Sequence, residues 1–218
     1  ITGGGGADNL TGGAGNDTFN VNAGTDTITD LSTGDILVVS SSATANATNI
    51  SSFVATSSTT NAGTANLSTQ ASGGTINMSS AGSSTTFSLT GGNGADNLTG
   101  DGGDDTITGG GGADNLTGGA GNDTYIFSSN SIVNGEIINE LSNEGTDIIK
   151  GLSTVNFSQM SNSSFNNIEK IDFGGLNSTF TFSSDQLSGK TISLTETIEG
   201  LSTFIIQASG SVNFINIT

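Results

Sequence analysis

The sequence predicts an all-β fold, a parallel β-roll or β-helix solenoid built from short strands and glycine-rich turns. Residues 1–18 recur letter for letter at residues 107–124, and both copies contain a nine-residue pattern, GGxGxDxUx, in which U is apolar. Repetition at a short fixed period is typical of a solenoid, in which each repeat packs only on its neighbours. Aspartates mark the period in two blocks, at Asp8, Asp17, Asp26 and Asp35 and at Asp96, Asp105, Asp114 and Asp123.

Each nonapeptide divides into a turn and a three-residue strand. Glycine takes positive φ readily and loses the most entropy in regular structure, so the GGxGxD part predicts a turn. In the xUx part, alternate side chains face opposite sides, so U points inward and its neighbours face solvent. A single strand of this kind buries nothing by itself. Stacked strands bury a continuous ladder of apolar side chains.

The chain divides into four predicted segments. Residues 1–39 form the first nonapeptide block, and residues 91–127 form the second. Between them, residues 40–90 are rich in Ser and Thr and carry no charge, and their short apolar pieces predict irregular β rungs in preference to a disordered linker. Residues 128–218 carry β-branched and aromatic clusters separated by glycines, which predict strands that continue or cap the solenoid, with a last strand at 212–218.

Stacked turns predict several bound calcium ions. If two nonapeptides make one turn of a flattened coil, loops eighteen residues apart lie on the same edge. Ca²⁺ prefers about six to eight oxygen ligands, and carboxylates together with the carbonyls of glycine turns supply them. Without a cation the stacked carboxylates would repel each other. Aspartates also occur as ordinary turn residues, but solvent-exposed turns need no fixed spacing. The predicted pairs are Asp96 with Asp114, Asp105 with Asp123, Asp8 with Asp26, and Asp17 with Asp35.

Composition narrows the functions that are open to the chain. Twenty acidic residues against three basic ones give a formal charge of −17, which excludes nucleic acid as a partner because phosphate binding needs clustered Lys and Arg. The chain has no Cys and no His, so disulfides, the usual zinc and haem ligands and His-dependent catalytic triads are excluded. Nothing singles out a catalytic pair among the many carboxylates, so we predict that the segment is not an enzyme. No apolar run approaches the length of a membrane span.

These repeats resemble those of the RTX, or repeats-in-toxin, family of secreted bacterial proteins, whose repeats form a parallel β-roll. The resemblance implies that one loop supplies the carbonyls of positions two and four plus its Asp. The loop eighteen residues later supplies positions one and three plus its Asp. Carried over to this sequence, one ion would be held by Gly92, Gly94, Asp96, Gly109, Gly111 and Asp114. A second ion would be held by the carbonyl of Asp101 and by Gly103, Asp105, Gly118, Ala120 and Asp123.

In the first block the same resemblance implies weaker sites. The paired glycines are missing from the second loop of the first site, and Thr33 replaces the fourth-position glycine before Asp35. The implied ligands of the first site are Gly4, Gly6 and Asp8 with Val21, Ala23 and Asp26, and those of the second are Gly13, Gly15 and Asp17 with Asp35.

Within the family, the chain is most like bacterial surface-layer proteins. Residues Asn167–Asp172 and Ser184–Leu187 resemble segments that interleave with the repeats of those proteins, and two separate repeat blocks indicate a modular array. Ile1 and Thr2 match the end of a nonapeptide, so we expect the chain to begin inside a longer polypeptide.

The resemblance implies a structural function outside the cell. It implies type I secretion, placement on the bacterial cell surface, folding on extracellular Ca²⁺ and assembly with copies of the chain in a lattice. Cell-surface polysaccharide is a further expected partner. Two alternatives stay open from the sequence: a segment of an RTX adhesin, and the C-terminal secretion and folding module of a secreted enzyme.

Overall fold

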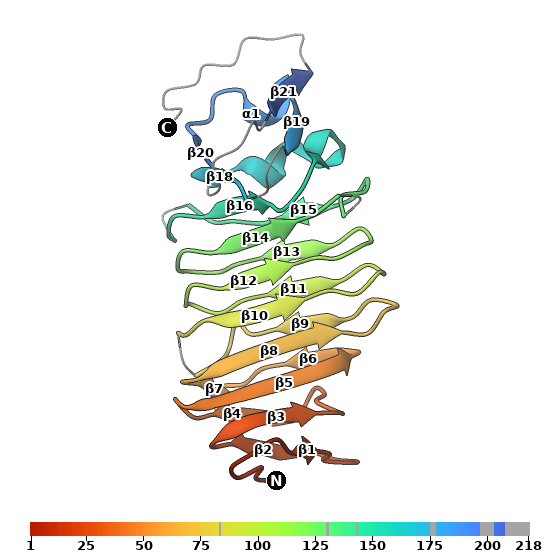
Figure 1. Ribbon diagram of the computed structural model, residues 1–218, viewed down its shortest axis with the longest axis vertical. Helices are drawn as coiled ribbons and strands as arrows, with labels where there is room; N and C mark the ends of the chain where they lie inside the picture. The colour runs from red at the N-terminus through yellow and green to blue at the C-terminus, as the bar shows by residue number, and fades with distance from the viewer. Residues whose placement is uncertain (83, 130, 143, 175–177, 197–202, 208–218) are drawn as a thin grey trace.

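The computed structural model describes residues 1–218 except for 83, 130, 143, 175–177, 197–202 and 208–218. Over these residues the chain winds into an elongated β-solenoid whose rungs stack from the N-terminal end to the C-terminal end (Figure 1). All the strand pairs between described residues are parallel. The predicted all-β solenoid of parallel strands is therefore confirmed. The predicted last strand at 212–218 lies outside the described residues.

One parallel sheet of ten strands runs the length of the molecule. It joins both nonapeptide blocks and the segment between them. In spatial order its strands are β1 (Asn9–Leu10), β3 (Gly24–Ile28), β5 (Ala43–Ile50), β8 (Thr64–Thr69), β10 (Phe87–Thr90), β12 (Thr106–Thr108), β14 (Thr124–Phe127), β16 (Ile148–Gly151), β18 (Lys170–Phe173) and β20 (Ser193–Glu196).

The chain alternates between this sheet and three shorter parallel sheets. The first of these contains β2 (Thr18–Val21), β4 (Ile36–Val39) and β7 (Thr60–Asn61). The second contains β6 (Ser52–Val54), β9 (Thr75–Asn77), β11 (Asn97–Thr99), β13 (Asn115–Thr117) and β15 (Ile137–Ile138). The third contains β17 (Val155–Asn156), β19 (Thr179–Ser183) and β21 (Thr203–Gln207).

Strand register is kept through the second block and on to β16 although the rungs differ in length, whereas a register shift between Ala47 and Ile50 interrupts the β5–β8 pair. In the second block paired residues are eighteen apart, as in Leu98 opposite Leu116. On the next rung Tyr125 lies opposite Ile149, which is twenty-four residues further on. The loops absorb the additional residues, because moving a strand by one residue would turn its buried side chains outward.

The inward U positions form the core that the repeat predicts. Each is buried, and those of one sheet lie directly opposite each other in the parallel register. Burying a Leu, Ile or Phe side chain contributes about 1.5–3 kcal/mol, so the ladder stabilises strands of only two to four residues. The U residues are Leu10, Phe19, Ile28 and Leu37 in the first block and Leu98, Ile107, Leu116 and Tyr125 in the second.

Residues 40–90 continue the coil, and alanines alternate with larger apolar residues among their inward side chains. Ala45 pairs with Ala65 and Ala47 with Leu67, and all four side chains are buried. This uncharged segment therefore supplies rungs β5 to β10 between the two repeat blocks.

The C-terminal part contains three helical turns that the sequence does not predict: η1 (Phe157–Gln159), η2 (Asn162–Phe165) and α1 (Ser184–Leu187). Side chains cap each of them, and at α1 the Ser183 amide donates to Gln186 Oε1 at 2.8 Å in a capping box. The Gln186 amide group in turn donates to the carbonyls of Phe157 and Met160 at 2.7 and 2.9 Å. No helix among the described residues has the length and apolar character to cross a membrane.

Candidate calcium sites

The parallel rungs bring the repeat aspartates together along two edges of the solenoid. In the second block the Asp96 amide donates to Asp114 Oδ1 at 2.9 Å, and the Asp105 amide donates to Asp123 Oδ1 at 2.7 Å. Each carboxylate is thus held at an ordinary hydrogen-bond distance by an amide of the loop one rung earlier. Its second oxygen is left for another partner.

The first block repeats this contact. The Asp8 amide donates to Asp26 Oδ1 at 3.1 Å, and the Asp17 amide donates to Asp35 Oδ1 at 2.9 Å. The structure therefore brings together all four aspartate pairs that the nine-residue period predicts.

Glycine lets the loops approach closely enough to make these contacts. A Cβ added to Gly109 would lie 2.5 Å from Oδ2 of Asp114, the aspartate of its own loop. A Cβ added to Gly112, whose φ is +117°, would lie 2.4 Å from the carbonyl oxygen of Gly94 on the loop below. The glycines therefore give space to the carboxylate and to the stacked backbone.

The predicted carbonyl ligands of the second block lie in these stacked turns. Gly111 donates its amide to the Gly92 carbonyl at 2.9 Å, and Ala120 donates to the Asp101 carbonyl at 3.2 Å. The carbonyls of Gly94, Gly103, Gly109 and Gly118 lie against the glycines of the adjacent loops, at Gly112, Gly121, Gly91 and Gly100 respectively.

Burial raises the pKa of Asp105, Asp114 and Asp123 to about 7. The main cause is the removal of each carboxylate from water, and neighbouring carboxylates add repulsion, although the amide donors lower the pKa in part. Burial also raises the pKa of Asp101. The folded edge therefore disfavours its own negative charge unless a cation is present.

The buried oxygens of these edges fit a hard divalent cation. Oδ2 of Asp26, Asp101, Asp114 and Asp123 is buried and has no hydrogen-bond partner among the described residues. A buried polar atom without a partner costs free energy, and three lysines against twenty acidic residues leave little positive charge to compensate. Carboxylate and carbonyl oxygens are the ligands that Ca²⁺ prefers, so the donor set fits calcium.

The first block departs from this arrangement at two places. Val21 ends strand β2, and its carbonyl accepts a hydrogen bond from the Ser40 amide at 2.9 Å, so it belongs to the strand ladder instead of a glycine turn. The reason is that only Asn22 and Ala23 separate β2 from β3, which leaves no room for a full loop. Asn22 Oδ1 accepts the hydrogen bond of the Gly4 amide instead, at 3.1 Å.

At the other predicted first-block site, protein donors already occupy both oxygens of Asp35. Oδ1 accepts from the Asp17 amide, and Oδ2 accepts from the Ser32 amide and hydroxyl at 2.8 and 3.0 Å. Asp30 lies nearby, and its carboxylate accepts from the amides of Gly12 and Gly13.

Positive φ angles are found at the predicted turn glycines of both first-block sites, which are Gly4, Gly6, Gly13 and Gly15.

The carboxylate ladder extends past the last nonapeptide, to acidic residues outside the predicted pairs. Asp123 donates its amide to Asp147 Oδ1 at 2.9 Å, and Asp147 donates to Glu169 Oε2 at 2.8 Å. On the other edge Asp114 donates to Glu136 Oε2 at 3.4 Å. In the sequence, such a residue can be recognised as an acidic residue two positions before an apolar strand residue, as in Asp147-Ile148-Ile149, but it lacks the nine-residue spacing.

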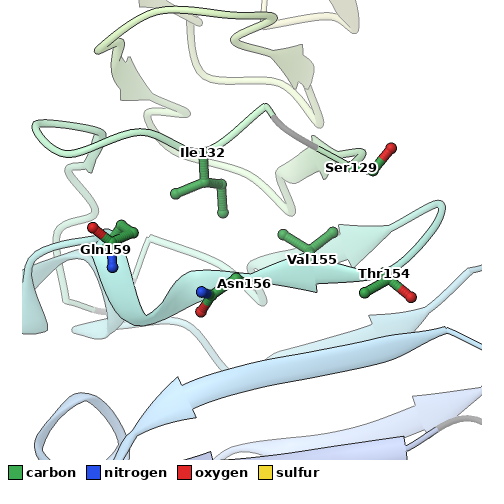
Figure 2. Close-up of a pocket in the computed structure, with 6 residues that line it drawn as sticks. All are labelled: Ser129, Ile132, Thr154, Val155, Asn156 and Gln159. Atoms are coloured by element: carbon green, nitrogen blue, oxygen red, sulfur yellow. The ribbon is translucent and has the colours of Figure 1, made fainter.

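A hollow elsewhere in the molecule has a different character. Figure 2 shows it between the loop that carries Ile132 and strand β17, with Ile132 and Val155 turned toward one another. Its lining residues are all uncharged, so the acidic chemistry of the molecule lies at the loop edges and not in this hollow.

Comparison with known proteins agrees with the repeat geometry. The family model of the RTX calcium-binding nonapeptide repeat matches in four copies, over residues 1–29 and 90–125. No curated protein and no solved structure matches the chain.

Proposed function

We propose that the chain, whose nonapeptides match the family model of the RTX calcium-binding repeat, is a structural, calcium-dependent part of a secreted bacterial cell-surface protein of the surface-layer type. In this proposal the segment acts as a stiff rod that assembles with copies of itself in a lattice outside the cell. Cell-surface polysaccharide is a further proposed partner.

The observation that carries the proposal is the continuity of the ten-stranded sheet. It passes through the first block, the uncharged segment and the second block without a break in strand pairing. A continuous parallel sheet with calcium-binding loops at its edges would be stiff, and this supports a role as a structural spacer.

Calcium would act as the folding switch. Free Ca²⁺ is scarce inside a cell, where the repulsion between acidic loops opposes folding and favours export of an unfolded chain. Outside the cell, abundant Ca²⁺ would bind the loops, and its binding free energy would become folding free energy.

Circular dichroism of the chain in calcium and after calcium removal by a chelator tests this switch. We expect the β spectrum to be lost without calcium and to return when calcium is added. Added magnesium is the control, because it demands a more regular octahedral shell and is expected to restore much less structure. A β spectrum that persists without calcium near neutral pH would contradict the switch.

Electron microscopy of the purified chain at increasing calcium concentration tests the lattice. We expect ordered two-dimensional arrays above the concentration at which the chain folds. Folded chains that stay monomeric at high protein and calcium concentration would refute the lattice role and leave the calcium-binding module in place.

A further inference from the structure

We propose that Asp123, Glu140 and Asp147 form an additional calcium site at the point where the nonapeptide period ends. This inference rests on the proposed calcium-binding function, but the site lies outside the pairs that the repeat spacing predicts. Among the described residues, these three are the one group of acidic side chains whose carboxylate oxygens all lie within 4.8 Å of one another.

Two loops supply the three carboxylates. Asp123 directly precedes strand β14, and Asp147 directly precedes strand β16, which pairs with β14 in the long sheet. Glu140 follows strand β15 of the neighbouring sheet. All three side chains are buried, with relative exposures of 0%, 1% and 8% for Asp123, Asp147 and Glu140.

Hydrogen bonds orient one oxygen of each carboxylate. Asp123 Oδ1 accepts from the Asp105 amide at 2.7 Å, and Asp147 Oδ1 accepts from the Asp123 amide at 2.9 Å. Glu140 Oε1 accepts from the Gly118 amide at 2.8 Å and from the Tyr125 hydroxyl. These donors hold the three side chains in place before any ion binds.

The remaining oxygens of two of these carboxylates point to a ligand. Asp123 Oδ2 and Glu140 Oε2 are buried, and neither has a hydrogen-bond partner among the described residues. Two buried acceptors without donors, within reach of a third carboxylate, cost free energy when they are charged, and a bound cation would offset that cost. The group has oxygen ligands from two loops and no nitrogen or sulfur ligand, a set that suits Ca²⁺ and not Zn²⁺.

Glu140 explains how a site survives the loss of the nine-residue spacing. Strand β15 pairs with β13 at a spacing of twenty-two residues instead of eighteen, so the residue that reaches Gly118 from the next rung is Glu140, whereas Gly118 itself lies against the glycine Gly100. The longer rung places the Glu140 carboxylate on the Gly118 amide instead. Oε1 of Glu140 therefore lies where the turn of a further nonapeptide would contact Gly118.

Counting bound calcium by equilibrium dialysis tests the site. We expect Glu140→Gln and Asp147→Asn each to bind one ion fewer per chain than the wild type. The matched control is Glu144→Gln, which removes the same charge from the same long loop but no carboxylate from the group. Its calcium count should equal that of the wild type.

Terbium luminescence gives a second, local readout. Tyr125 is the only tyrosine of the chain, there is no tryptophan, and its hydroxyl contacts Glu140. Excitation of tyrosine should therefore sensitise Tb³⁺ at this site, and Glu140→Gln should weaken that emission severalfold while Glu144→Gln preserves it.

The outcomes separate this inference from the proposed function. A Glu140→Gln chain that keeps the full calcium count and the full terbium emission would overturn the additional site alone. A wild-type chain that binds no calcium would overturn the proposed function together with the site.

Discussion

At the scale of single residues, adjacent glycines of one loop have different roles. Gly112 takes a φ of +117° and lies close above the Gly94 carbonyl, whereas Gly111 has ordinary space around an added Cβ, with the nearest atom at 3.7 Å. The sequence already shows this difference, because the position of Gly111 is occupied by alanine in other repeats, at Ala14 and Ala120.

Replacing Gly112 by alanine should therefore destabilise the calcium-loaded protein. A strained backbone conformation costs on the order of 1–3 kcal/mol, and the contact with the Gly94 carbonyl adds to it. Thermal unfolding at saturating calcium measures the loss. Gly111→Ala is the control and should change the midpoint little; equal losses in both variants would contradict the role assigned to Gly112.

A carboxylate of the second block can be removed without changing the shape of its side chain. Asp114→Asn keeps an oxygen for the Asp96 amide but removes the negative charge that faces the proposed ion. Loss of a charged contact costs roughly 1.5–3 kcal/mol, so the calcium concentration at the folding midpoint should rise about tenfold or more. A calcium titration followed by circular dichroism measures it.

Asp104→Asn is the matched control for this titration. Asp104 is exposed, and the corresponding position holds alanine or asparagine in other repeats, at Ala95, Ala113 and Asn122. Its midpoint should stay close to that of the wild type. A shift as large as that of Asp114→Asn would mean that overall charge, and not ligation, governs folding.

At the scale of elements, the solenoid changes its means of stabilisation toward the C-terminus. The repeat rungs combine one apolar side chain per strand with an acidic edge, whereas the helical turns surround an aromatic cluster. Phe157 lies at its centre, with ring centroids at 4.8 to 6.1 Å from those of Phe127, Phe165, Phe180 and Phe182.

Phe157→Ala should destabilise this part of the molecule even when calcium is saturating. Truncating a buried phenylalanine costs about 3–5 kcal/mol, and Phe157 is fully buried. Chemical denaturation in calcium measures the loss, and equilibrium dialysis should show an unchanged number of ions. Leu152→Ala, at an exposed position, is the control. A calcium count that falls with Phe157→Ala would show that the two parts fold as one unit.

At the scale of the whole molecule, charge opposes folding until a cation is bound. Folding raises the pKa of Asp105, Asp114 and Asp123 from an ordinary 3.8 to about 7 and that of Glu136 and Glu140 from 4.5 to about 8. The main cause at each is burial. The acidic edges of the second block and of the rung that follows it therefore couple protons, calcium and folding.

The sign of the resulting pH dependence follows from linkage. Because the folded pKa values are raised, the folded state holds more protons than the unfolded state between about pH 4 and pH 8. Calcium-free protein should therefore lose stability as pH rises through that window and keep most structure near its acidic end. With saturating calcium the trend should reverse, since ligation needs deprotonated carboxylates.

Circular dichroism melts in metal-stripped buffers and in calcium, each near pH 5 and near pH 8, measure both trends. A calcium-free protein that is more stable near pH 8 would contradict the assigned burial of these carboxylates.

The local structure of the repeats follows from the sequence alone. The spacing of Asp8 to Asp35 and of Asp96 to Asp123 predicts the turns, the inward apolar positions and the four aspartate pairs that the structure brings together. This succeeds because an eighteen-residue rung makes spatial neighbours of residues at a constant sequence separation.

Which other acidic residues lie along these edges depends on the tertiary packing and is not predicted by the repeat. Glu140 and Asp147 lie 22 and 24 residues after the groups that donate to them, the amides of Gly118 and Asp123. These separations depend on loop lengths that vary from rung to rung, so a fixed repeat period does not predict them. Parallel pairing nevertheless restores the register at β16, because the core requires Ile149 to face inward above Tyr125, and that packing carries the Asp147 carboxylate to the edge.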